Sequence, residues 1–123
     1  MNLKVLNLED NAIKHYEICR ILKRNGIEEI DWVRNLEDGL KKVEENKYDL
    51  YITDMWYPKH SGGPDNRSGE LFIKEILKRK DSAPVILCSN QNYAYPEIYG
   101  TLYYSERSDW EEELERYIRQ LKQ

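Results

Sequence analysis

Three acidic side chains lie at points where apolar runs of the sequence stop. The run at residues 3–8 leads directly into Glu9 and Asp10, and the run at residues 48–53 ends at Asp54. Short apolar runs of this kind are typical of strands buried on both faces of a parallel sheet. The carboxyl ends of such strands meet at one edge, where open α/β sheets bind ligands. The sequence therefore predicts that Glu9, Asp10 and Asp54 lie together in one crevice.

Clustered carboxylates repel one another, and a hard divalent cation relieves that repulsion. Mg²⁺ prefers oxygen ligands and binds one or two protein carboxylates together with phosphate oxygens. An Asp beside such a cation can act as a nucleophile toward phosphorus, which is the role we predict for Asp54. Ser89 follows the apolar run at residues 84–88 and can donate a hydrogen bond to the new phosphoryl group. The simpler alternative is that Asp54 only caps a turn.

Strand-like and helix-like patterns alternate along the chain and supply the elements that position these residues. Apolar runs predict strands at residues 3–8, 29–34, 48–53, 84–88 and 101–105. Helical spacing of apolar residues predicts a helix at residues 12–25 and further helices beginning near Leu36, Gly69 and Trp110, the last with Ser108 in a capping box. Short connections and right-handed crossovers then give an α/β fold: one open, doubly wound parallel sheet with helices on both faces.

Two segments show no regular pattern. Residues 59–68 contain two adjacent glycines and a proline, so we expect a mobile loop that closes over the site or supplies Lys59 or Arg67 to it. Residues 93–104 hold five of the ten tyrosines. That density is consistent either with core packing or with a protein-binding surface.

Composition bounds the class of protein. With 123 residues, 40% hydrophobic and 34% charged, the chain fits one soluble globular domain. The net charge of −4 lacks the basic excess typical of nucleic-acid binding, so we expect no nucleic-acid partner. No apolar run approaches a membrane span, and the first residues do not resemble a signal peptide, so we expect no membrane association and a cytoplasmic location. Cys19 and Cys88 are expected to be buried thiols.

In its acidic residues and in the strands that precede them, the chain resembles the receiver domains of two-component response regulators. The resemblance rests on the stretches at residues 5–11, 54–58 and 86–89 and on the spacing of all five strands. It implies a flavodoxin-like fold with strand order 2-1-3-4-5 over residues 1–123, with no output domain. It also implies a signalling module rather than an enzyme.

The resemblance implies roles for the acidic residues. Asp54 is the phosphoacceptor, and Glu9, Asp10 and Asp54 hold Mg²⁺. The backbone carbonyl of Trp56 completes the protein's share of the metal shell. The phosphoryl donor is a histidine kinase or a phosphotransfer protein, and a downstream protein partner reads the phosphorylated state.

The resemblance also implies two switch residues, Ser89 at the end of the fourth strand and Tyr103 in the fifth. Members of the family carry a lysine at the end of the fifth strand that contacts the phosphoryl oxygens. Counting three residues on from Tyr103 gives Glu106 instead. We therefore expect slow or short-lived phosphorylation, and Glu106→Lys to increase it. The short interval after Ser89 also predicts that the fourth helix of the family is reduced or irregular.

These observations leave two functions open. The first is a stand-alone receiver that is phosphorylated on Asp54 with Mg²⁺. The second is a pseudo-receiver, a protein-interaction module that does not depend on phosphorylation. A flavin- or nucleotide-binding protein is disfavoured, because a phosphate-binding loop after the first strand needs glycines and free amides where this chain has Glu9 and Asp10. A metal-dependent nuclease is disfavoured because no second acid follows Asp54 closely.

Overall fold

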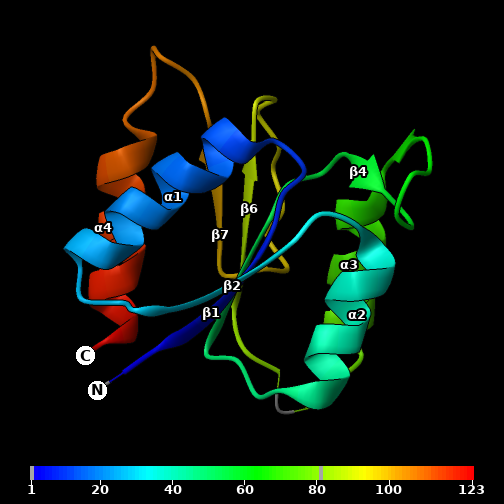
Figure 1. Cartoon of the computed structure of the whole chain (residues 1–123). Coiled ribbons are helices and arrows are strands. Elements are labelled where there is room, and N and C mark those ends of the chain that lie inside the picture. Colours follow the sequence, from blue (N-terminus) through cyan, green and yellow to red (C-terminus); the bar gives the residue numbers. More distant parts are fainter. Residues whose placement is uncertain (1, 81) are drawn as a thin grey trace.

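A parallel sheet of five strands organises the molecule, with β3 in its centre (Figure 1). The computed structural model describes residues 2–80 and 82–123. The strands lie in the order β2-β1-β3-β6-β7, which confirms the predicted topology. Their bounds are β1 Lys4–Leu8, β2 Glu29–Val33, β3 Leu50–Thr53, β6 Val85–Ser89 and β7 Gly100–Tyr103.

Helices cover both faces of this sheet, as the alternating pattern predicts. In the described residues they are α1 Ala12–Arg24, α2 Leu36–Glu45, α3 Ser68–Leu77 and α4 Trp110–Leu121. Figure 1 shows α1 and α4 on one side of the sheet and α2 and α3 on the other. Each side has its own apolar core, and all four residues of β3 are buried between them. None of the helices in the described part of the chain is long and apolar enough to span a membrane.

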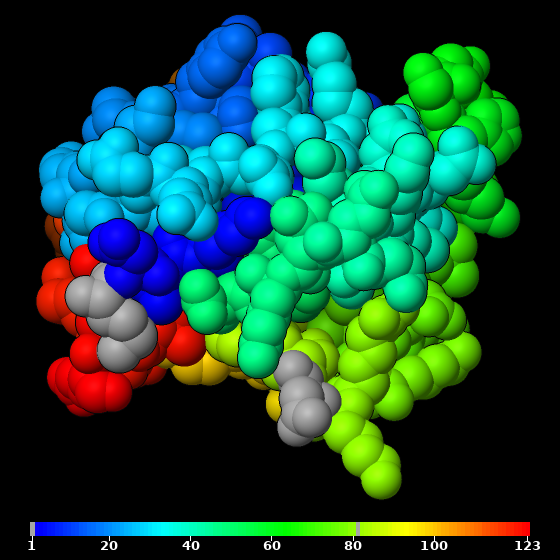
Figure 2. Space-filling view, turned by 60° about the horizontal axis from the view of Figure 1, so that its bottom comes forward, coloured from blue at the N-terminus to red at the C-terminus, as the bar shows by residue number. Residues whose placement is uncertain are grey.

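The ends of the chain lie away from the edge where the parallel strands end. Figure 2 shows residues near the N-terminus, in dark blue, beside those of α4, in red. Figure 1 places both termini at the bottom of the sheet, whereas β6 points upward to its carboxyl end. The edge predicted to hold the acidic residues therefore lies at the opposite end of the sheet from the first and last described residues.

Helix α1 begins and ends close to the predicted positions. The side chain of Asn11 caps it by accepting a hydrogen bond from the backbone N–H of Lys14 at 3.0 Å. After Arg24 the chain turns through Asn25 and Gly26, whose φ of +85° is a conformation that favours glycine. Not every apolar residue of this helix faces the core, since Ile13 on the first turn is 72% exposed.

The two irregular segments differ in the structure. Within residues 59–68 the chain forms part of a short antiparallel hairpin, β4 Tyr57–Pro58 with β5 Asp65–Asn66, which the sequence pattern does not reveal. Between β6 and β7, residues 90–99 are all described and form no helix. The expectation of a reduced fourth helix is therefore confirmed.

The last strand and its neighbours differ from the prediction in a way that affects the site. Strand β7 ends at Tyr103, two residues before the predicted end. Helix α4 is preceded by Asp109 rather than capped by Ser108. The hydroxyl of Ser108 instead donates hydrogen bonds back to the carbonyls of Tyr103 and Ser105. These bonds fold the chain into a tight turn directly after the strand.

Gly69 holds the start of α3 against the end of β3. Its backbone N–H donates to the carbonyl of Met55 at 2.9 Å. A Cβ at this position would lie 2.1 Å from the carbonyl oxygen of Asp54, which is backbone and cannot turn aside. The close approach therefore fixes the backbone of Asp54 and requires glycine.

We predict that Gly69→Ala lowers the free energy of unfolding by about 2–3 kcal/mol, because the added methyl group collides with backbone. Gly39→Ala is the matched control, since Gly39 is also helical but its added Cβ would meet the side chain of Leu8. That side chain can move, and alanine gains about 1 kcal/mol in helix propensity over glycine. Urea denaturation of both variants measures the difference. Equal costs would contradict the assigned backbone contact.

Candidate functional site

The predicted acidic cluster forms at the carboxyl edge of the sheet. Oxygen atoms of Glu9, Asp10 and Asp54 all lie within 4.8 Å of one another. Strands β1 and β3 are neighbours with Leu8 opposite Thr53, so the residues that follow each strand emerge side by side. The backbone N–H of Asp54 donates to the carbonyl of Leu8 at 3.0 Å and continues the pairing by one residue. The ladder itself therefore aligns the acids.

The cluster opens into a cavity of about 550 Å³. Residues that follow β1, β3, β6 and β7 line it together with Asp65 of the hairpin. They include Trp56, Asn90, Gln91 and Tyr104 beside the three acids. The cavity therefore draws on the ends of four parallel strands, which is where ligands bind in open α/β sheets.

Lys14 brings a positive charge into this cluster from α1. Its Nζ lies 2.9 Å from Glu9 Oε1 and 3.2 Å from Asp54 Oδ1. It also donates a hydrogen bond of 2.6 Å to the carbonyl oxygen of Cys88, at the end of β6. The side chain is only 7% exposed. A buried lysine is rare unless it is paired, and here two carboxylates and a carbonyl satisfy the ammonium group.

Sequence reasoning missed Lys14, although one signal was present. Lys14, Ile18 and Ile21 recur at i, i+4 and i+7 on α1, and the two isoleucines are fully buried. A lysine on the apolar stripe of a helix is an exception to the pattern. Such a residue indicates that a partner of opposite charge lies within reach of that face.

Burial and mutual repulsion set the protonation of the cluster. Burial raises the pKa of Glu9 to about 7, with a smaller increase from Asp54, whereas Lys14 opposes the shift. Burial also raises the pKa of Asp10, and the negative charges of Asp65 and Asp54 add to that effect. For Lys14, burial alone lowers the pKa, but the nearby Cys88, Glu9 and Asp54 outweigh it, so the pKa lies above its usual value. The ammonium group therefore stays charged at neutral pH.

The residues fit a divalent metal ion. All three candidate ligands are carboxylates, the donors that Mg²⁺ prefers. Glu9 Oε1 is buried and, despite its proximity to Lys14, accepts no well-aligned hydrogen bond from the described residues. A buried carboxylate oxygen in that state gains a ligand bond when a cation binds. Trp56 lines the same cavity, so its predicted role as a carbonyl ligand is consistent with its position.

The other predicted site residues lie around the cluster in different ways. Ser89 is buried at the end of β6, where its hydroxyl accepts a hydrogen bond from the backbone N–H of Gln91 at 3.2 Å. Tyr103 pairs with Ser89 in the sheet, but its side chain is 41% exposed and lines a separate hollow with Gln91 and Arg107. The switch roles of Ser89 and Tyr103 therefore remain predictions.

The part predicted for Glu106 stays a prediction, and the structure places this residue away from the lining of the acidic cavity. Glu106 is exposed and is not among the described residues that line the acidic cavity. Because β7 ends at Tyr103, the residue that reaches the cavity from this strand is Tyr104. Its hydroxyl donates to Glu17, and its ring lies 5.3 Å from Lys14 Nζ. The position three residues after Tyr103 therefore lies beyond the end of β7, in the turn that follows the strand.

The hairpin also differs from expectation, because it contributes an acid rather than a cation. Neither Lys59 nor Arg67 is among the described residues lining the cavity, whereas Asp65 is. The guanidinium of Arg67 lies over the rings of Trp56 and Tyr93 at 5.9 and 5.6 Å and pairs with Glu70. Arg67 therefore connects the hairpin to the segment after β6 without entering the acidic cluster.

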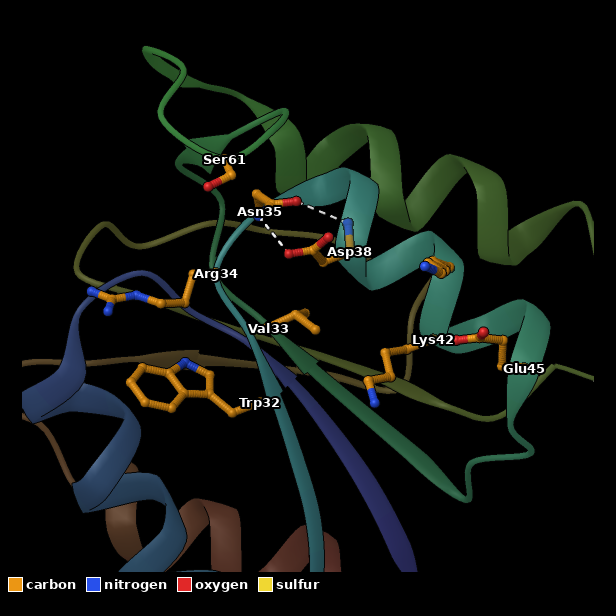
Figure 3. Close-up of a pocket in the computed structure, with 9 residues that line it drawn as sticks. Trp32, Val33, Arg34, Asn35, Asp38, Lys42, Glu45 and Ser61 are labelled. Atoms are coloured by element: carbon orange, nitrogen blue, oxygen red, sulfur yellow. Dashed lines mark hydrogen bonds between the residues drawn. The ribbon is translucent and has the colours of Figure 1, made fainter.

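A second cavity, of about 500 Å³, lies between β2 and α2 (Figure 3). Its lining mixes both charges, with Arg34 and Lys42 near Asp38. Asp38 is already paired with Asn35: the Asn35 side chain caps α2 by accepting from the Asp38 backbone N–H, and it donates to the Asp38 carboxylate, as drawn in the figure. No cluster of metal-ligating groups forms among the described residues there. The acidic cavity is therefore the candidate site.

Comparisons with known proteins agree with this geometry. Residues 5–98 match the response regulator receiver domain. Protein y4jS of Sinorhizobium fredii is 32% identical over 79 residues, which make up 63% of this chain but only 18% of that protein.

Two solved structures of one protein are similar over almost the whole chain. Response regulator protein TrrA of Thermotoga maritima in complex with Mg²⁺ and BeF is 27% identical, with a TM-score of 0.77 over 97% of this chain and 98% of that one. TrrA in complex with histidine kinase ThkA is 26% identical, with a TM-score of 0.75 over 98% and 99% of the two chains. From its matched sequence, its sheet order and its acidic edge, the chain belongs to the response regulator receiver domain family.

Proposed function

We propose that this chain is a receiver that accepts a phosphoryl group on Asp54 with Mg²⁺ bound beside it. The observation that carries the proposal is the convergence of Glu9, Asp10 and Asp54 within 4.8 Å at the mouth of a cavity. When bound, Mg²⁺ supplies positive charge that offsets these carboxylates and the oxygens of an incoming phosphoryl group.

The reaction needs little from the protein beyond position and charge. A carboxylate oxygen of Asp54 attacks phosphorus and forms the new O–P bond of an acyl phosphate. The bond between phosphorus and the donor breaks, and its electron pair leaves with the donor atom, which takes up a proton. For a phosphohistidine donor that atom is a ring nitrogen. The backbone contact of Gly69 and the pairing with Leu8 hold Asp54 in place during this step.

The proposed donor is a histidine kinase or a phosphotransfer protein, and a downstream protein partner reads the state. The similarity to TrrA, which is solved in complex with a histidine kinase, supports this choice. The acidic net charge of −4 supports protein partners over nucleic acid. In this proposal the chain acts in the cytoplasm as a signalling module and not as an enzyme.

A second function is favoured by one observation. Lys14 already offsets part of the negative charge of Glu9 and Asp54 from within the chain. This would suit a pseudo-receiver, which binds partners without phosphorylation, because the carboxylates of its pocket must be balanced by a positive charge from within the chain. The two functions differ in whether Asp54 becomes modified.

We predict that Mg²⁺ binds to the acidic cluster and that its affinity falls by about tenfold per pH unit below pH 7. Burial raises the pKa of Glu9 to about 7, so below that pH a proton competes with the metal for this carboxylate, and above it the carboxylate is free. Titration of tryptophan fluorescence measures the affinity, because Trp56 lines the cavity. In Glu9→Gln the affinity should be lower and the pH dependence reduced. Equal wild-type affinities at pH 6 and pH 8 would contradict the assignment.

We predict that incubation with Mg²⁺ and acetyl phosphate adds one phosphoryl group, seen by intact mass spectrometry, and that Asp54→Asn abolishes the adduct. Asp65→Asn is the matched control, because Asp65 lines the same cavity but is not the proposed acceptor. An adduct that persists in Asp54→Asn would refute the acceptor assignment. Mg²⁺ binding without any adduct, also with a phosphorylated kinase as donor, would favour the pseudo-receiver.

A further inference from the structure

The acidic cavity has a single internal source of positive charge. Of the described residues that line it, only Lys14 is cationic. The members of the family carry their lysine at the end of the last strand, where this chain has Tyr104. The cavity therefore contains an ammonium group, but one that comes from α1.

The position of this ammonium group matches a contact to a phosphorylated Asp54. Nζ lies 3.2 Å from Oδ1 of Asp54, the side chain that would carry the phosphoryl group. An acyl phosphate on that carboxylate places its oxygens next to the same Nζ. An ammonium group has three donors, so it can keep the carbonyl of Cys88 while it contacts a new oxygen.

The surroundings of Lys14 hold it there. Asn11 caps the first turn of α1 through the backbone N–H of Lys14 itself. Cys88 anchors the tip of the side chain, and the ring of Tyr104 lies beside it, with Nζ 5.3 Å from the ring centroid. Tyr104 thus fills the space at the end of β7 and stabilises the charge of Lys14 through its ring face. A group held at both ends pays little conformational entropy when it forms a new contact.

We propose that Lys14 contacts the phosphoryl group on Asp54 and takes the part that a lysine after the last strand takes in other receivers. This inference rests on the proposed function of Asp54. It reverses the expectation drawn from Glu106, because the site does not lack a lysine but receives it from a different element.

The charges of the cluster favour this role. With all three carboxylates ionised, as they are when a metal ion binds them, and with Lys14 charged, Glu9, Asp10, Asp54 and Lys14 carry a net charge of −2, which one Mg²⁺ offsets. Phosphorylation replaces one negative charge of Asp54 by about two, so the loaded site holds about −1. Without Lys14 it would hold about −2. Lys14 therefore competes with the metal but stabilises the phosphorylated state.

Because Lys14 competes with the metal but stabilises the phosphoryl group, its removal should change the affinities for Mg²⁺ and for a phosphoryl analogue in opposite directions. Lys14→Met keeps an unbranched apolar side chain and removes the charge. We expect Mg²⁺ to bind this variant about tenfold more tightly or better, because a competing cation is gone. We expect beryllium fluoride, a phosphoryl analogue, to bind about tenfold more weakly or worse at saturating Mg²⁺. Fluorescence titrations of the full chain measure both affinities.

Two control variants separate this role from general effects of charge. Lys23→Met removes an exposed lysine from the same helix, and Glu106→Lys adds one at the exposed position first suspected. Both should leave the two affinities unchanged within about twofold. An increase in beryllium fluoride affinity in Glu106→Lys would overturn the inference, as would unchanged affinity in Lys14→Met.

The outcomes also distinguish this inference from the proposed function. If the wild-type chain binds neither Mg²⁺ nor beryllium fluoride, the proposed function fails. If the wild-type chain and Lys14→Met bind both equally well, only the role of Lys14 fails. If Lys14→Met loses both affinities but is still folded, as judged by cooperative unfolding, Lys14 serves only to shape the pocket. That result would overturn the inference too.

The wild-type chain provides a second measurement in case Lys14→Met does not fold. Its lysines can be labelled with ¹⁵N at Nζ, and the buried ammonium of Lys14 exchanges its protons more slowly than exposed lysines do. Adding beryllium fluoride to the Mg²⁺-bound chain should shift this resonance and leave those of exposed lysines in place. An unshifted Lys14 signal, with the analogue demonstrably bound, would refute the contact.

Discussion

The structure depends on placing three carboxylates at one edge of a buried sheet. Like charges so close together destabilise the fold unless a positive charge or protons balance them. Two features of the chain reduce this repulsion: burial raises the pKa of Glu9 to about 7, so that it takes up a proton more readily, and Lys14 places an ammonium group among the acids. The same repulsion that the fold must tolerate is what makes the edge attractive to a divalent metal ion. The fold is therefore more stable when the negative charge of these carboxylates is reduced, whereas metal binding requires that charge.

Most of the fold and the acidic centre could be predicted from the sequence, because both follow from local patterns. Buried strands show as apolar runs, and parallel strands bring the residues at their ends together, so Glu9, Asp10 and Asp54 were found without any long-range information. Lys14 was missed because its place on the apolar stripe of α1 indicates only that a charged or polar partner exists, and its partner on β6 lies 74 residues away, beyond any local pattern. The end of the last strand was placed two residues too late, because the turn after β7 depends on hydrogen bonds from Ser108 that no local pattern records.

The segment between β6 and β7 shows how the fold accommodates a lost helix. Residues 90–99 cross from one strand to the next without regular structure, yet contacts at both ends hold them. Tyr99 packs on Tyr117 of α4 and donates to its carbonyl oxygen at 2.8 Å. At the other end Tyr93 contacts Trp56 and Arg67. The tyrosines of this region thus serve packing and also join the segment to the rim of the acidic cavity, whereas the protein-binding surface stays a prediction.

The hydrogen bond from Lys14 to Cys88 has a consequence for the order in which the molecule folds. Helix α1 forms from neighbouring residues, and Glu9 lies close to Lys14 in sequence. The other groups that satisfy Lys14 come from distant segments: Asp54 directly after β3, and the carbonyl of Cys88 on β6, 74 residues further along. Until those strands pair, the ammonium group gains more from water than from a bare apolar sheet. Pairing between distant strands is slow compared with helix formation. Docking of the first turn of α1 therefore waits for the central strands, and the acidic pocket becomes complete only when the sheet does.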